Sequence, residues 1–479
     1  MAKTDLRATA PKVKPLLIIG VSGATWSVLS RLKARGRIPN IERLLGRGTG
    51  ASLSSVRATG DEHYRPQTAW PSLATGLHPD RHGVTRFFHE AAELRAPTLW
   101  RIYAEHGLSS GIYGWPGTWP PPQIPGFVVP SHLARDTRTW PPDLRDLKGL
   151  DREQQSLERD GGAFRRLRGA FSAGAVLVRR GLKPHTFGEL ALVAPQVLFG
   201  DSGRRPLLLR RMKLKVSRDM FLALYRRTRP DFAAFITFYV DFVSHRYWRY
   251  RDLPLGDNSR EQRFYAEAVD RAYETFDRVV GDLVAAAGPD SIVAIMSEHG
   301  MDPEPMSAEV GDWYYSIRGS RVAELAGLDP DIRAHPVARW VAFRPVSATT
   351  SRGVADRLRQ ILVVETGLPL FRVYEHGDEV VVKFLLDREV PRYATGDISN
   401  LNIQIGETVV PFAEVGKKAG PTRSAMHARD GVLVMVGPNI RRGHWAGEAS
   451  ILDIAPTLLK AVGVKPDIQF DGTALDVFG

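Results

Sequence analysis

The run Leu16-Leu-Ile-Ile-Gly20 is a short apolar segment that ends in glycine, and a loop separates it from Ile38-Pro39-Asn40 and a helical stretch at 41–45. A parallel strand that is covered on both faces passes into a helix in this way. Similar apolar runs, each flanked by Gly, Pro or a charged turn, lie at 109–113, 232–238, 292–296 and 432–436. Helices fit between them, as at 262–287, so the sequence predicts an α/β fold with a largely parallel sheet.

Two stretches interrupt this alternation. Residues 120–228 begin Pro-rich and become basic and helical, and residues 302–422 include a polar, strand-like portion near 379–386. We interpret both as insertions on loops, the second one cap-like. The core then comprises 15–119, 229–301 and 423–479, preceded by an N-terminal arm at 1–14.

Composition limits the class of protein. A chain of 479 residues with 43% hydrophobic content can bury a large core. No run approaches the roughly 20 apolar residues of a membrane span, and the N-terminal arm is too polar for a secretion signal, so we expect a cytoplasmic protein. Cysteine is absent, which excludes disulfides and thiolate ligands. Any metal must be a hard or borderline cation held by His, Asp, Glu or hydroxyl groups.

The formal charge is +12, and much of the excess lies between Arg152 and Arg227. This basic stretch is either a solvated face or a docking surface for phosphate-bearing lipid or polymer, which would make a peripheral membrane contact. Its apolar runs at 173–178 and 190–198 suit an interfacial helix, although core packing is the commoner outcome. We expect no specific nucleic-acid binding, because no known module is present and the charges are not interleaved with aromatics.

Three segments carry candidate ligands: Asp241-Phe-Val-Ser-His245, Ser297-Glu-His-Gly300 and His427. If the chain turns into a helix after 232–240, Asp241 and His245 project from one face. Ligands of such sheets bind at the carboxyl ends of strands, and two of these segments follow a predicted strand while His427 precedes one. Each pair alone is more often structural, but together the three segments indicate a metal site.

These segments belong to a longer ordered set of motifs. The set consists of Gly20-Val-Ser-Gly-Ala-Thr-Trp26, Pro39-Asn40, Trp70-Pro-Ser-Leu-Ala-Thr-Gly76, Pro79-Asp-Arg-His82-Gly83, Arg229-Pro-Asp231, Asp241, His245, Trp248, Ser297-Glu-His-Gly300, His427, Gly431, Gly437-Pro438, Asp453-Ile-Ala-Pro-Thr-Leu-Leu459 and Asp471-Gly472. In this order the motifs resemble the type I phosphodiesterase and nucleotide pyrophosphatase branch of the alkaline phosphatase superfamily. The resemblance implies an alkaline-phosphatase-like α/β core and skips both proposed insertions.

The resemblance also implies two metal ions. One ion is held by an Asp, a His four residues later and a distant C-terminal His, which correspond to Asp241, His245 and His427. The second ion is held in such proteins by an Asp after the first strand, an Asp-His pair and a Thr or Ser nucleophile. Here that half is altered: Ser22 stands at the first Asp, Glu298 replaces the Asp before His299, and Pro66 falls at the nucleophile.

The alterations weaken the second half-site. Ser22 is a neutral, poor ligand, Glu298 can still bind a cation, and Pro66 has no nucleophilic atom. Thr68 is the nearest hydroxyl and either replaces the nucleophile or caps a helix that starts near Trp70, with the cap slightly favoured. Arg65 has the planar fork of donors that pairs with a phosphate oxygen.

We therefore expect a metal-dependent hydrolase of phosphoric esters, a phosphodiesterase or a phosphatase-like enzyme, with one strong and one weakened metal site. Zinc is the expected ion and manganese the alternative, and either Thr68 or water attacks phosphorus. The substrate is a phosphate-bearing small molecule or lipid. The alternative is a catalytically silent relative that keeps the fold to bind a phosphorylated ligand or a partner protein.

Overall fold

The structure is a computed structural model that describes residues 13–61, 63–85, 89–149, 174, 176–199, 204–252, 264–303, 313–337, 340–344, 350–376, 379–385, 400–421 and 424–479. Most of the predicted N-terminal arm and the basic residues at 151–173 lie outside this set. The chain divides into two compact units, Met1–Pro303 with Ala425–Gly479, and Glu304–Ser424. In the part of the chain that is described, no helix is long and apolar enough to cross a bilayer.

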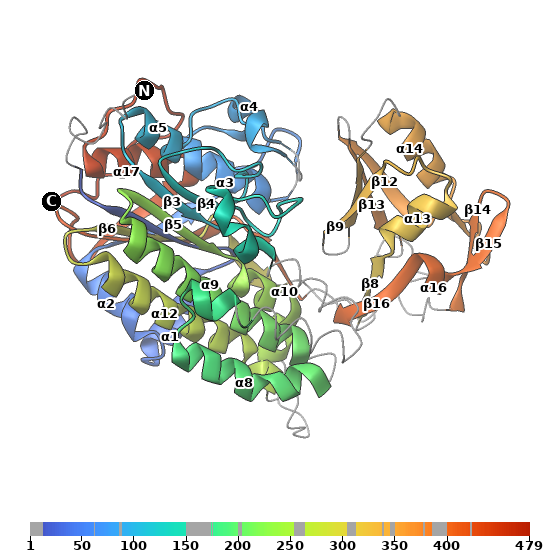
Figure 1. Ribbon diagram of the computed structural model, residues 1–479, viewed down its shortest axis with the longest axis horizontal. Helices are drawn as coiled ribbons and strands as arrows, with labels where there is room; N and C mark the ends of the chain where they lie inside the picture. Colours follow the sequence, from blue (N-terminus) through green and yellow to red (C-terminus); the bar gives the residue numbers. More distant parts are fainter. Residues whose placement is uncertain are drawn as a thin grey trace. The chain divides into compact units, whose positions relative to one another are not determined.

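The large unit is built on an eight-stranded sheet of order β19-β2-β18-β6-β1-β5-β3-β4 (Figure 1). Its strands are β1 (Leu16–Val21), β2 (Thr49–Ser54), β3 (Ser110–Tyr113), β4 (Gly126–Val129), β5 (Phe232–Thr237), β6 (Ile292–Met296), β18 (Asp430–Val436) and β19 (His444–Ser450). Within it, β18 runs antiparallel to β2 and β6, and the other neighbouring strands are parallel. The predicted α/β class with a largely parallel sheet is confirmed.

Strand β1 lies at the centre of this sheet because its side chains are apolar on both faces. It pairs with β5 and β6, and Leu16 lies opposite Phe232 on one side and Ile292 on the other. The predicted strands at 109–113, 232–238, 292–296 and 432–436 are all present. The sheet also continues through β4 into the stretch that we expected to be an insertion.

Helices cover both faces of the sheet (Figure 1). Leu17, Ile19 and Val21 of β1 pack with α1 (Trp26–Ala34), α2 (Pro39–Arg47), α9 (Arg204–Thr228), α10 (Tyr239–Asp252) and α12 (Ala268–Ala287). Leu16 and Ile18 pack with α3 (Pro66–Thr75), α5 (Leu99–Glu105) and α17 (Ile454–Val462). The remaining elements are α4 (Pro79–His82), α8 (Pro184–Phe199), β7 (Gly300–Pro303), β17 (Ala425–Ala428), η2 (Ala91–Glu93), η3 (Pro142–Leu144) and η5 (Ile451–Asp453).

The small unit has its own hydrophobic core, which includes Val341, Phe343, Leu358 and Val382. Its strands form sheets of order β12-β13-β10-β9, β11-β14-β15 and β16-β8. The elements are β8 (Trp313–Ile317), α13 (Gly319–Leu325), β9 (Arg333–Val337), β10 (Trp340–Arg344), α14 (Ser351–Arg359), β11 (Leu362–Val363), β12 (Phe371–His376), β13 (Glu379–Phe384), β14 (Asn402–Ile405), β15 (Thr408–Pro411), α16 (Phe412–Val415) and β16 (Gly416–Pro421).

Gly20 provides a test of how tightly α3 packs on β1. A Cβ added at Gly20 would lie 2.4 Å from side-chain atoms of both Trp70 and Ile236, whereas a Cβ at Gly46 in α2 meets nothing within 4 Å. We expect Gly20→Ala to lower the free energy of unfolding by about 1–3 kcal/mol, because the core there is already filled. Gly46→Ala should raise it by about 0.5–1 kcal/mol. The midpoint of urea unfolding measures both, and a Gly20→Ala protein as stable as its parent would contradict this packing.

Candidate metal centre

The first two ligands stand on one helix. Helix α10 starts directly after β5, so Asp241 and His245 lie one turn apart, with 3.3 Å between Asp241 Oδ1 and His245 Nε2. The backbone N–H of Asp241 donates to the carbonyl of Ser22 across 3.0 Å, which ties α10 to the end of β1. Gly23 has a φ of +77°, and a Cβ there would lie 2.9 Å from Asp241 Cα. Glycine therefore permits this close approach.

The pairing of strands β7 and β17 brings His427 close to Asp241 and His245. Strand β17 pairs antiparallel with β7, which sets His427 opposite Met301. Because β18 runs antiparallel to β6, the chain enters β18 at the edge where β6 ends. The residues that precede β18 therefore meet Glu298 and His299, which follow β6.

Backbone carbonyls orient all three imidazoles. The Nδ1 atoms of His245, His299 and His427 lie 2.7 Å from Ala425 O, 2.9 Å from Gly300 O and 2.6 Å from Tyr64 O, respectively. A carbonyl oxygen only accepts hydrogen bonds, so each Nδ1 carries a ring proton, and Nε2 is the ring nitrogen that can bind a cation once it has lost its own proton. Histidines that bind metals are held in this way by their other ring nitrogen.

The Nε2 atoms of His245 and His427 lie close to each other and to the carboxylate of Asp241. His427 Nε2 lies 2.9 Å from His245 Nε2 and 3.1 Å from Asp241 Oδ1. One ligand atom each from Asp241, His299 and His427 lies within 4.8 Å of the others. Two lone pairs at 2.9 Å repel each other unless a cation or a proton lies between them. Ligands at about 2.0–2.1 Å around a tetrahedral zinc ion are separated by about 3.3 Å, so the donor set fits such an ion.

The charges of these groups suit a cation. Burial alone would raise the pKa of Asp241, but His245 and His427 hold the pKa of that carboxyl well below its usual range. Burial also lowers the pKa of His299 well below its usual value, and His427 adds to this effect. Asp241 is therefore ionised and His299 neutral, and these are the forms that bind metals.

The comparison with protein families bears on this arrangement. The model of the type I phosphodiesterase / nucleotide pyrophosphatase family matches residues 16–346. The chain belongs to this family. The family is part of the alkaline phosphatase superfamily, in agreement with the fold of the large unit. A comparison with curated proteins found no match. His427 lies beyond the matched residues, so it is the pairing of β17 with β7 that brings it to the site.

Ser22, Glu298 and His299 form a second cluster beside these ligands, and an internal hydrogen bond closes it. Ser22 Oγ donates to Glu298 Oε1 across 2.6 Å. His299 Nε2 lies 3.3 Å from the same oxygen and 3.5 Å from Ser22 Oγ. All three residues are completely buried. The longer stem of Glu298 thus brings its carboxyl group to Ser22.

Burial raises the pKa of Glu298 to about 8, and the hydrogen bond from Ser22 only partly opposes this shift. The indole N–H of Trp70 also lowers that pKa, although neither it nor Glu298 Oε2 has a hydrogen bond of ordinary geometry within the described residues. At neutral pH Glu298 is therefore mostly protonated. Ser22 and Glu298 are then both neutral, and neutral oxygens bind a divalent cation less strongly than carboxylates do.

The segment at the nucleophile position borders the site through Tyr64, whose carbonyl accepts from His427. Helix α3 begins at Pro66, with Arg65 as its N-cap, so the prediction that Thr68 caps a helix starting near Trp70 is wrong. Pro fits that first position because its missing N–H has no partner there. Thr68 lies in the first turn and its hydroxyl donates to Arg65 O across 3.1 Å.

Arg65 is paired within the same loop. Its guanidinium donates to both carboxylate oxygens of Asp61, and its side chain is 27% exposed. A phosphate would have to compete with this ion pair for the planar fork of Arg65. Of the residues chosen from sequence, Asp241, His245, His299 and His427 come together, Ser22 and Glu298 lie beside them, and Arg65 and Thr68 make their described bonds locally.

The sequence did not indicate the three carbonyls that orient the histidines. Tyr64, Gly300 and Ala425 contribute backbone atoms, which every residue has, so residue type carries no signal for them. The buried indole of Trp70 was also missed as a neighbour of Glu298. It was recognised only as part of a motif.

His82, from one of the quoted motifs, is buried between α4 and α3. Its Nε2 lies 2.9 Å from Ser72 Oγ, and its Nδ1 accepts the backbone N–H of Val84 across 3.2 Å. Burial lowers the pKa of His82 to about 4. The imidazole therefore links α3 to the turn after α4 as a neutral group.

This buried imidazole should make the protein sensitive to acid. The unfolded chain takes up the proton near its ordinary pKa of about 6.5, whereas the folded chain does so only near 4, so the free energy of unfolding should fall as the pH drops between these values. The shift corresponds to about 3 kcal/mol. We expect His82→Asn to remove most of this loss, as measured by urea unfolding across that pH range. An unchanged pH dependence in the variant would contradict the assignment.

Proposed function

We propose that the protein hydrolyses phosphoric esters with one divalent cation, held by Asp241, His245 and His427 with His299 alongside. The observation that carries this proposal is the set of three Nδ1–carbonyl bonds, which leaves the Nε2 atoms of His245 and His427 3.3 Å and 3.1 Å from Asp241 Oδ1. Imidazole and carboxylate ligands favour zinc, with manganese as the alternative.

Such a cation would act as a Lewis acid, polarising a phosphoryl oxygen and lowering the pKa of a nearby water molecule. The chain's own groups prepare the site for it. Ionised Asp241 offsets the positive charge, and the stacking of His299 on His427, with 3.9 Å between ring centroids, keeps both rings in place. The substrate in this proposal is a phosphate-bearing small molecule or lipid.

Water is the nucleophile that we propose. Pro66 has no nucleophilic atom, and the hydroxyl of Thr68 donates to the carbonyl of its own helical turn. Attack by water on a phosphoric diester forms a new P–O bond, breaks the bond to the leaving alcohol and transfers a proton to that alcohol. No covalent intermediate with the protein is needed.

The second candidate is a catalytically silent relative that binds a phosphorylated ligand or a partner protein. The bond between Ser22 and Glu298 favours this candidate, because it occupies the place of a second cation. The proline at the nucleophile position favours it as well. Retention of four potential ligands with compatible tautomers favours the hydrolase.

Turnover separates the two candidates. We expect the purified full chain, supplied with zinc or manganese, to hydrolyse bis(4-nitrophenyl) phosphate, and His245→Ala to lower the rate at least about a hundredfold because a ligand is lost. Thr68→Val should keep the rate within a few-fold, because it removes only the hydroxyl. Release of nitrophenol measures both variants.

The remaining outcomes are equally informative. A Thr68→Val protein as inactive as His245→Ala would identify Thr68 as the nucleophile and overturn the role of water. One bound cation with no turnover of phosphate monoesters, phosphate diesters or sulfate esters would support the silent relative.

The weak half-site should be repairable. We expect the unaltered protein to retain one cation per chain after dialysis, and Ser22→Asp combined with Glu298→Asp to retain two, because two carboxylates replace two neutral groups. Metal analysis of the dialysed proteins gives the stoichiometry. Ser22→Asn with Glu298→Gln is the matched neutral control and should retain one. Two cations in the unaltered protein, or in the neutral control, would contradict the closed half-site.

A further inference from the structure

Helix α8 exposes an unusual face. Its 16 residues include one charged side chain, Glu189. Phe187 is 51% exposed and Leu192 is 76% exposed, and Val178, shortly before the helix, is 57% exposed. A solvent-facing helix surface normally carries charged and polar side chains.

The exposed apolar side chains of α8 lie on one side of the helix. At 100° per residue the exposed residues fall in one arc of about 180°. They are Pro184, His185, Phe187, Gly188, Ala191, Leu192, Pro195 and Gln196. The two polar residues, His185 and Gln196, lie together at one edge of the arc, and the other six have no polar side-chain group. The expectation of core packing for 190–198 is therefore wrong at Leu192, the most exposed of them.

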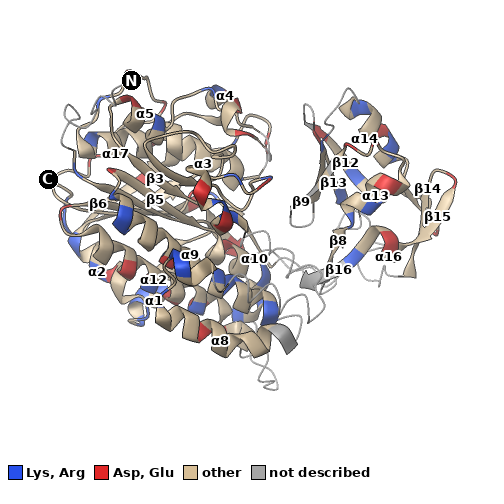
Figure 2. Ribbon diagram, in the orientation of Figure 1, with Lys and Arg blue, Asp and Glu red and all other residues tan. Residues whose placement is uncertain are grey.

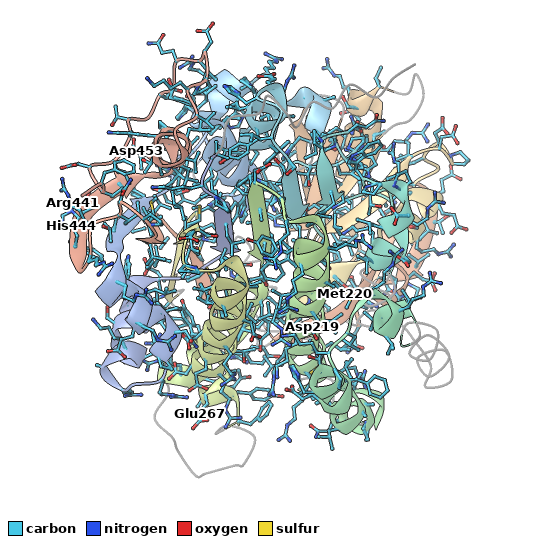
Figure 3. The ribbon with its side chains drawn as sticks, turned by 60° about the vertical axis from the view of Figure 1, so that its left-hand side comes forward. Asp219, Met220, Glu267, Arg441, His444 and Asp453 are labelled. Atoms are coloured by element: carbon cyan, nitrogen blue, oxygen red, sulfur yellow. The ribbon has the colours of Figure 1, made fainter. Side chains whose placement is uncertain are left out.

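The other side of α8 is already packed. Leu190 contacts the core of the large unit, and Thr186 is buried. Helix α8 lies against α9, where Arg205 Nε donates to Val197 O across 2.9 Å. At the other end of α8, Asp219 of α9, labelled in Figure 3, accepts the backbone N–H of Lys183 across 3.1 Å. The exposed arc thus points away from the rest of the large unit.

The surroundings of α8 are strongly basic. Residues 174–228 contain 12 Lys and Arg against three acidic residues. Figure 2 shows α8 almost free of charge, with Lys and Arg along α9. The guanidinium of Arg211, 39% exposed, lies 4.0 Å from Glu189 of α8. Arg179, shortly before α8, is also exposed.

We propose that α8 docks on an anionic lipid surface, with its apolar arc in the interface and the flanking cations against the headgroups. Sixteen residues are too few to span a bilayer, which needs about 20. An apolar arc flanked by Lys and Arg is the pattern of helices that lie in the membrane interface. Each basic side chain near an anionic surface adds attraction that falls with salt.

Vesicle sedimentation of the full chain tests this proposal. We expect binding to vesicles of phosphatidylcholine with phosphatidylglycerol, weaker binding at high salt, and little binding to phosphatidylcholine alone. Leu192→Glu and, independently, Phe187→Ser should lower the partition coefficient about tenfold. Val409→Glu is the matched control, because Val409 is 56% exposed in β15 of the small unit, and it should bind like the parent.

Several results would overturn the proposal: no binding to anionic vesicles, an equal loss of binding in Val409→Glu, or insensitivity to salt. Dimers that Leu192→Glu dissolves, without vesicle binding by the parent, would assign the arc to a second copy of the chain. The melting temperature of each variant checks its fold. Hydrolysis of a water-soluble diester should be unchanged in Leu192→Glu, so lipid docking and the proposed function can fail separately.

Discussion

Three backbone carbonyl oxygens orient the candidate site, since each accepts a hydrogen bond from Nδ1 of one histidine and thereby sets the direction of Nε2. The carbonyls belong to Tyr64 before α3, Gly300 in β7 and Ala425 in β17. These segments lie far apart in the chain, so the donor set exists only in the folded protein. The antiparallel course of β18 is what makes their meeting possible, because it returns the chain to the edge where β6 ends.

The same edge of the sheet holds two carboxyl groups of opposite character, Asp241, whose side chain is 16% exposed, and Glu298, which is completely buried. Asp241 and Glu298 both experience desolvation, which favours the protonated form. Two imidazoles around Asp241 outweigh this cost and keep it ionised. The main hydrogen-bond donor to Glu298 is the hydroxyl of Ser22, which is neutral. Its effect is smaller than that of burial, so the pKa of Glu298 stays raised. The difference between the two carboxyl groups follows from the neighbours of each and not from a difference in fold.

Strands and site residues could be predicted from sequence where a single pattern, such as an apolar run or a helical spacing, determines the local structure. The run at 292–296 is uniformly apolar because β6 is covered on both faces, and the spacing of Asp241 and His245 requires only one helical turn. Strands β2 and β19 were missed because Thr49–Ser54 and His444–Ser450 are rich in small and polar residues. The start of α3 at Pro66 and the ion pair of Arg65 with Asp61 depend on a loop conformation for which residue type gives no period.

Helix α9 packs against the exposed helix α8 and also against α10, which carries Asp241 and His245. Its start lies at the site edge of the sheet, where the guanidinium of Arg210 is 4.5 Å from the ring centroid of Phe242, the residue after Asp241. Helix α8 packs on α9, and Leu192 in its exposed arc is 76% exposed. A charge placed on that arc changes the solvation of one surface. We expect it to leave the packing that orients Asp241 and His245 intact, so the proposed membrane association and the proposed hydrolysis can be tested separately.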